Sequence, residues 1–169
     1  MVFYPNSDVL RAARALVGIS QSVLAKHAGL GPNLVSKSET DGNSLGDTLH
    51  KIRLSLEALG VRFASDSEVA SDKASHNDFL RAARAFTGMS QAELANLAGL
   101  DQKSISNAEK GENLTRQTEA SLRLALTGLG IKFVISEGRV VSVAYNRPKN
   151  KRRNPSSAKT RPTKREHGH

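Results

Sequence analysis

The chain has 169 residues, of which 38% are hydrophobic and 24% charged, which is enough for one ordinary soluble domain or two small ones. It contains no cysteine, so disulfide bonds and thiolate metal sites are excluded. The amino terminus lacks the basic start and apolar core of a secretion signal, and no stretch reaches the roughly 18 apolar residues that span a bilayer. We therefore expect a soluble, cytoplasmic protein with no membrane partner.

The net charge of +9 is concentrated at the carboxyl end of the chain. Residues 146–169 hold nine Lys or Arg and one Glu, so this segment carries +8 and residues 1–145 carry +1. With three Pro and no large apolar residue, the segment cannot bury enough surface to offset the entropy cost of ordering. We predict a disordered basic tail, which is either an electrostatic arm that raises DNA affinity or a solvated extension without a role.

An internal repeat divides the rest of the chain. Residues 8–63 and 78–133 align without a gap, 25 of these 56 positions are identical, and the hexapeptide LRAARA recurs unchanged. A gapless match of this length indicates duplication, and two copies are too few for a solenoid. We predict two small domains at residues 1–64 and 78–145, joined by a linker rich in Ser, Asp and Ala at residues 65–77.

Each copy is expected to form four helices. In the second copy the first helix carries an apolar stripe with a spacing near 3.6 residues, formed by Leu80, Ala83, Ala85 and Phe86. Gly88 ends this helix, and Ser90 with Glu93 forms a capping box that begins the second one. The inner face of the second helix consists of Leu94, Ala95 and Ala98.

The third helix of the second copy is predicted to span Gln102–Lys110, with Asp101 as its cap, Ile105 inside and Gly111 at its end. A fourth helix follows at about 115–128 and buries Leu122, Leu126 and Leu129.

Strands are expected after the fourth helix of each copy. In the second copy, residues 131–136 and 140–145 alternate around a two-residue turn, which predicts a β-hairpin. The first copy follows the same order of elements, but its strand, Val61–Ala64, has no partner strand after it. The fold class is therefore mostly α, with one short strand in the first copy and a hairpin in the second.

Two helices joined by a three-residue turn containing Gly form a DNA-binding pattern. The segment SQAELANLAGLDQKSISNAEKG resembles the helix-turn-helix of Cro-type phage repressors, the xenobiotic-response-element family. The resemblance covers both copies, about two thirds of the chain, and implies two λ-repressor-like domains that bind double-stranded DNA. Its marks are Gln91, Ala95, Gly99 and Ile105 in the second copy, and Gln21, Ala25, Gly29 and Val35 in the first.

In this arrangement the third helix of each copy enters the major groove with its amino-terminal half leading. Gln and Asn pair with adenine edges and Lys reaches guanine acceptors. The candidate base-reading residues are Gln102, Lys103, Ser106 and Asn107 in the second copy, and Asn33, Ser36 and Lys37 in the first. The candidate phosphate contacts are Gln91, Lys110, Arg116 and Arg84 in the second copy, and Gln21 and Arg14 in the first.

Two pairs have a further role that the resemblance implies. Arg14 with Glu39, and Arg84 with Glu109, are expected to form ion pairs that hold the recognition helix and orient the arginine toward phosphate. A purely structural role remains an equal alternative, since removing one partner of a shielded pair leaves an uncompensated charge.

The first copy has fewer cations around its third helix. Thr40 stands where the second copy has Lys110, Gly46 stands where it has Arg116, and acidic residues lie close by. Each lost cation weakens the salt-dependent part of DNA binding. We therefore expect the second copy to dominate DNA affinity.

Two copies in one chain suggest a covalent pseudo-dimer on half-sites about 34 Å apart. The connecting segment reaches about 46 Å when extended, so it is long enough for the two copies to occupy adjacent half-sites but does not require them to. The open edges of the strands suggest a second contact. Either the first strand joins the hairpin within the chain, or hairpins pair between chains and make a homodimer.

The leading functional hypothesis is a sequence-specific transcriptional regulator that binds double-stranded DNA. The alternative is a protein-binding helix-turn-helix module, an antitoxin or antiactivator, with weak or no DNA binding of its own. An enzyme is not expected, because the sequence has no phosphate loop, no nucleophile elbow and no metalloprotease helix. We also expect no cofactor, no metal site and no small-molecule ligand.

Overall fold

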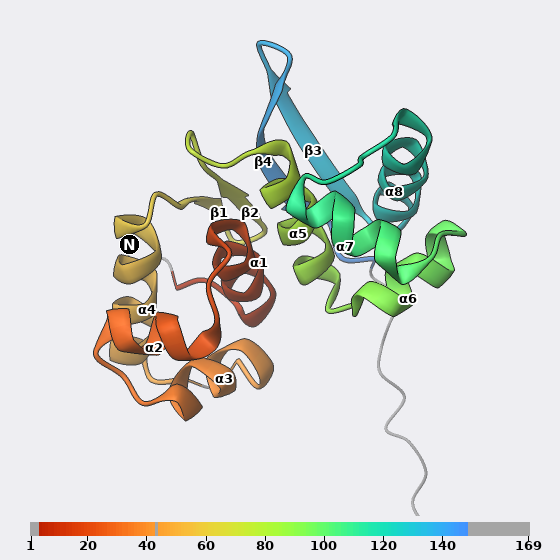
Figure 1. Ribbon diagram of the computed structural model, residues 1–169. Coiled ribbons are helices and arrows are strands. Elements are labelled where there is room, and N and C mark those ends of the chain that lie inside the picture. Colours follow the sequence, from red (N-terminus) through yellow and green to blue (C-terminus); the bar gives the residue numbers. More distant parts are fainter. Residues whose placement is uncertain (1–3, 43, 149–169) are drawn as a thin grey trace, which may run out of the picture.

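The computed structural model describes residues 4–42 and 44–148, so residues 149–169 of the predicted tail lie outside the described part of the chain. The described residues are mostly helical, as predicted, and add a small antiparallel sheet (Figure 1). The helices are α1 (Ser7–Val17), α2 (Gln21–Ala28), α3 (Pro32–Thr40), α4 (Gly46–Ala58), α5 (His76–Thr87), α6 (Gln91–Ala98), α7 (Gln102–Lys110) and α8 (Arg116–Gly128). The strands are β1 (Arg62–Ser65), β2 (Glu68–Ala70), β3 (Ile131–Ser136) and β4 (Arg139–Tyr145).

Local sequence signals explain where the helices of the second repeat begin. Each of them starts after a residue whose side chain accepts a hydrogen bond from the amide three positions later: Ser75, Ser90, Asp101 and Thr115. In the first repeat, α3 and α4 start after Gly31 and Leu45, which cap neither helix with a side chain. The predicted capping box of Ser90 and Glu93 is confirmed. The second repeat therefore has the better-capped helices.

The core is built around α1 and α5, which lie side by side at the centre of the molecule (Figure 1). The remaining helices of each repeat, α2–α4 and α6–α8, lie on opposite sides of this central pair. The small side chains of Ala12 and Ala13 on α1, and of Ala82 and Ala83 on α5, are fully buried. Since buried residues cover a wide arc of α1, this helix packs on α3 and α4 of its own repeat and also on α5 of the other.

The strands form one sheet in the order β1-β2-β4-β3, with every neighbouring pair antiparallel. The predicted hairpin is confirmed as β3 and β4. The sheet joins the repeats, because β2 of the first pairs with β4 of the second. No helix within residues 4–42 and 44–148 is long and apolar enough to span a membrane.

The segment 65–77 differs from the prediction of a linker. It contains β2, in which Val69 and Ala70 are buried, and β2 is the partner strand that β1 was predicted to lack. The prediction that the first copy ends in an unpaired strand is therefore wrong. The prediction that the first strand joins the hairpin is also wrong, because β1 pairs with β2 and it is β2 that pairs with β4.

The register of the two hairpins explains why the sequence comparison missed the first one. Phe63 lies opposite Val69 in the first hairpin, and Phe133 lies opposite Val143 in the second, so these residues occupy equivalent places. The first hairpin reaches from Phe63 to Val69 over fewer residues than the second needs from Phe133 to Val143. A gapless comparison ends at the first phenylalanine and cannot align the strands that follow.

Candidate nucleic-acid interface

Two short helices, α6 and α7, form the candidate helix-turn-helix of the second repeat. Gly99 ends α6 in the left-handed conformation, with a φ of 66°, and the amide of Leu100 then donates to the carbonyl of Ala95. Ala95 is 2% exposed and Ile105 is fully buried, so the small residue and the core residue predicted for this pair both face inward. The first repeat has the same arrangement, with Ala25 and Val35 buried between α2 and α3.

The inner and outer faces of α7 differ sharply. Its buried residues are Ile105, Ala108 and Glu109. The predicted base-reading residues lie on the rest of the helix, with Gln102 and Lys103 exposed and Ser106 and Asn107 half-buried. The helix therefore presents a row of amide, hydroxyl and ammonium groups away from the core.

The matching face of α3 is less polar. Asn33 and Lys37 are exposed and Ser36 is half-buried, so the three predicted residues of the first repeat also lie outside the core. Leu34 lies among them and is 42% exposed, where the second repeat has Ser104. The outer face of α3 thus offers an apolar side chain and fewer hydrogen-bonding groups.

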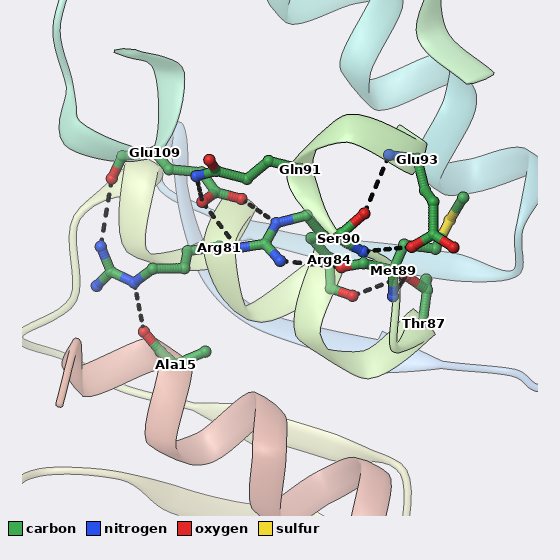
Figure 2. Close-up of polar contacts among 9 residues, drawn as sticks. All are labelled: Ala15, Arg81, Arg84, Thr87, Met89, Ser90, Gln91, Glu93 and Glu109. Carbon is green, nitrogen blue, oxygen red and sulfur yellow. Dashed lines mark hydrogen bonds and ion pairs between the residues drawn. The ribbon is translucent and has the colours of Figure 1, made fainter. Parts of the chain in front are cut away.

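Glu109, at the end of α7, anchors the helix to the rest of its repeat. Its carboxylate is 6% exposed and accepts two hydrogen bonds from Arg84, with N–O distances of 2.5 and 2.9 Å. The side-chain amide of Gln91 donates to the same carboxylate at 2.9 Å, and Arg84 donates a further bond to the carbonyl of Met89 (Figure 2). The predicted ion pair of Arg84 and Glu109 is confirmed, and it ties α5, α6 and α7 together.

The first repeat contains the same network. Arg14 donates to both oxygens of Glu39 at 2.6 and 2.9 Å and to the carbonyl of Ile19 at 2.9 Å, and Gln21 donates to Glu39 at 2.8 Å. The predicted pair of Arg14 and Glu39 is therefore confirmed as well. Each network joins three helices of its own repeat.

These networks change how the predicted phosphate contacts can act. The side-chain amides of Gln21 and Gln91 are bonded to glutamate, so a phosphate at these residues would meet the backbone amides of the first turn of α2 or α6. Arg84 uses three of the five N–H donors of a guanidinium, and Arg14 does the same. Each arginine keeps donors for a further acceptor.

Lys110 and Arg116 flank α7 with exposed side chains. Neither forms an ion pair with another residue in the described part of the chain. Thr40 and Gly46, the equivalent residues of the first repeat, bring no charge. Exposed cations are thus present at these two positions beside α7 and absent from the equivalent positions beside α3.

Two carboxylates cap the helices of the candidate site in the second repeat. Hydrogen bonds from the backbone amide and the hydroxyl of Ser104 lower the pKa of Asp101, and bonds from the amide and hydroxyl of Ser90 lower the pKa of Glu93. Both side chains lie at a helix amino terminus, where the helix dipole also favours a negative charge. The first repeat has Val23 and Gly31 at these positions.

Sequence reasoning missed two arginines close to this site. Arg11 and Arg81 lie one helical turn before Arg14 and Arg84, and each contacts the opposite repeat. The signal was present, because both belong to the LRAARA hexapeptide that recurs unchanged. A repeat alone does not show which of its residues face the other copy.

Comparison of the chain with protein-family models finds no match, and comparison with curated protein sequences finds none either. Within residues 4–42 and 44–148, no group of three His, Asp or Glu side chains is placed to hold a metal ion.

Proposed function

We propose that the protein is a sequence-specific transcriptional regulator that binds double-stranded DNA through two λ-repressor-like helix-turn-helix units. In this proposal α3 and α7 are the recognition helices. The observation that carries it is the two-sided character of α7: Glu109 locks one side to α5 and α6, while Gln102 and Lys103 are exposed on the other. A rigid helix with an outward row of amide and ammonium groups is suited to reading base edges in a major groove.

The relation between the repeats supports a pseudo-dimer. Equivalent residues make reciprocal contacts across the pair α1 and α5, which is the property of a two-fold interface. The half-sites of an operator bound by a helix-turn-helix dimer have the same symmetry. We propose that α3 and α7 occupy adjacent major grooves of one duplex as a covalent pseudo-dimer.

The second repeat is proposed to dominate DNA affinity. Lys110 and Arg116 supply charge beside α7, and Asp101 caps the helix that would enter the groove. The equivalents in the first repeat are uncharged, and Leu34 interrupts the polar face of α3. An operator with one strong and one weak half-site follows from this difference.

The test is selection of bound duplexes from a random pool with the full-length protein at a stated salt concentration of about 0.15 M. We expect one enriched bipartite site. The double variant Lys103→Ala/Asn107→Ala should then lose about ten- to a hundredfold in affinity, and Asn33→Ala/Lys37→Ala should lose less. A larger loss from the variant in α3 would contradict the dominance of the second repeat.

A second candidate function is a protein-binding module, and the outer face of α3 is the observation that favours it. Leu34 is 42% exposed there and Leu45, just before α4, is 81% exposed. Apolar residues on a helix suit a protein surface better than a phosphate backbone. If the selection enriches no sequence, the protein-binding function is favoured.

A further inference from the structure

Arg11 connects three parts of the molecule. Its Nε donates to the carbonyl of Ala85 on α5 at 3.3 Å, and its Nη1 donates to the carbonyl of Glu39 in α3 at 2.8 Å. Its Nη2 forms an ion pair with Asp8, one helical turn earlier, at 2.5 Å. One guanidinium on α1 therefore joins the carboxyl end of the recognition helix of its own repeat to the central helix of the other repeat.

Arg81 makes the same contacts in the opposite direction. Its Nε donates to the carbonyl of Ala15 on α1 at 2.6 Å, and its Nη1 donates to the carbonyl of Glu109 at 3.2 Å (Figure 2). Its Nη2 pairs with Asp78 at 2.7 Å. The two arginines are equivalent residues of the repeat, so they form a reciprocal pair across the interface. We call Arg11 and Arg81 the arginine clamps.

Two glycines leave room for the clamps. Gly18 and Gly88 end α1 and α5 in the left-handed conformation, with φ angles of 70° and 71°. A Cβ atom on Gly18 would lie 2.9 Å from Nη2 of Arg81, and one on Gly88 would lie 3.5 Å from Nη2 of Arg11. Gly18 and Gly88, which have no side chain, therefore leave the space that Arg81 and Arg11 occupy at the opposite repeat.

The clamps act where the recognition helices end. Glu39 and Glu109 supply both the carbonyl that each clamp binds and the carboxylate that Arg14 or Arg84 binds. The position of α3 is thereby linked through Arg11 to α5, and the position of α7 is linked through Arg81 to α1. A guanidinium is planar with donors in fixed directions, so it restricts both distance and orientation.

We infer that the arginine clamps are positioning residues that fix the distance and orientation of α7 relative to α3, so that the protein recognises a composite duplex site with one allowed spacing. The inference rests on the proposed function for its DNA substrate. A flexible linker would let the two repeats follow a range of spacings. Instead, the connecting segment is held in the sheet through β2, and the clamps lock the central helices.

The first experiment measures the geometry without DNA. The chain contains no Cys, so Lys26→Cys/Asn96→Cys places two spin labels on exposed, equivalent residues of α2 and α6. We expect a single narrow distance distribution from pulsed electron paramagnetic resonance. Adding Arg11→Ala/Arg81→Ala should broaden it, and adding Arg62→Ala/Arg139→Ala, which removes two exposed arginines, should leave it narrow.

A broad distribution in the labelled protein with both clamps intact would overturn the inference, and so would a distribution that is unchanged without them. If Arg11→Ala/Arg81→Ala fails to fold, Arg11→Lys keeps the charge but not the forked geometry, and it should broaden the distribution. A narrow distribution in a folded Arg11→Lys protein would then count against the clamp.

The second experiment uses the selected duplex and derivatives with base pairs inserted between the half-sites. An insertion of about five base pairs turns one half-site to the opposite face of the duplex, and about ten restore the face at a greater distance. Both should cost the unaltered protein about a hundredfold in affinity, because only one repeat can then engage. In Arg11→Lys/Arg81→Lys, the affinities for the original and the altered spacings should differ by less than about tenfold.

These outcomes separate the inference from the proposed function. Tight binding by the unaltered protein at every spacing would overturn the inference and leave DNA binding intact. Binding to no selected duplex would overturn the proposed function, and the distance measurement would then decide the role of the clamps. A clamp that merely stabilises the fold would lower affinity equally at all spacings, which would also contradict the inference.

Discussion

Val69 of β2 and Val143 of β4 lie directly opposite each other where the two repeats join into one sheet. Both side chains are fully buried. Each is also the residue opposite the phenylalanine of its own hairpin, so the two valines are equivalent members of the repeat facing one another. The contact between the repeats therefore has the same two-fold character in the sheet as in the central helices.

The contact of Val69 with Val143, which we call the seam between the repeats, should contribute to the stability of the whole molecule. We expect Val69→Ala and Val143→Ala each to lower the free energy of unfolding by roughly 1–3 kcal/mol, because each removes fully buried apolar surface. The double variant should cost less than the sum, since the two side chains are direct neighbours. Urea denaturation followed by circular dichroism measures these values, with Ile135→Ala as the control.

Ile135 lies in β3 and is 54% exposed, so its truncation should change the free energy of unfolding by less than about 0.5 kcal/mol. If the seam variants were as mild as this control, the sheet would not hold the repeats together.

The boundaries of α7 show what the sequence could predict. Asp101 and Gly111 are local signals, a side-chain cap and a left-handed end, and they fixed the helix at Gln102–Lys110 as the structure has it. The pair of Arg84 and Glu109 was predictable from the family resemblance because both partners lie within one repeat. Local chemistry and repeated motifs were thus sufficient for the four helices of the second repeat.

The contacts between the repeats were not predictable from the same signals. Arg11 and Arg81 bind backbone carbonyls of the opposite repeat, and a carbonyl leaves no mark on the sequence. The hairpin that contains Val69 was missed because its strands are shorter than those of its counterpart, so the second strands fall out of a gapless alignment. Ser, Asp and Ala in that segment suggested a linker, although three of its residues, Val69, Ala70 and Ser71, are buried.

Removing the arginine of a buried ion pair should cost much more stability than removing the arginine of an exposed one. Arg84→Ala leaves the carboxylate of Glu109, 6% exposed, without its main partner, and we expect a loss of about 3 kcal/mol or more in the free energy of unfolding. Arg62→Ala is the matched control, because the partner of Arg62 is Asp72, with a side chain that is 77% exposed. The control should cost less than about 1 kcal/mol.

Urea denaturation at low and at high salt would distinguish this effect from interactions between exposed charges, which salt screens. Equal and small losses from both arginine variants would contradict the anchoring role of Glu109.

The cations beside α7 should set the salt dependence of DNA binding. If Lys110 and Arg116 each contact one phosphate, Lys110→Ala/Arg116→Ala should reduce the slope of log affinity against log salt by about 2. Thr40→Lys adds a cation at the equivalent place beside α3 and should steepen the slope by about 1. Fluorescence anisotropy titrations at several salt concentrations measure both slopes, and an unchanged slope in the double variant would place these cations away from the duplex.

Acid should loosen the second repeat before the first, because the two helix-capping carboxylates with lowered pKa values, Glu93 and Asp101, both belong to the second repeat. A carboxylate whose pKa is lower in the folded state contributes stability above its unfolded pKa, roughly 4 for these side chains, and loses that contribution as the pH falls through the folded pKa.

We therefore expect the backbone amides of α6 and α7 to lose protection against hydrogen exchange at a higher pH than those of α2 and α3. Exchange rates corrected for their intrinsic pH dependence, followed by NMR between about pH 6 and pH 3, measure this difference. The variant Glu93→Gln/Asp101→Asn keeps the hydrogen-bonding oxygens without the titrating groups. In this variant the amides of both repeats should lose protection at the same pH. If the second repeat of this variant still opened first on acidification, the capping carboxylates would not be the cause.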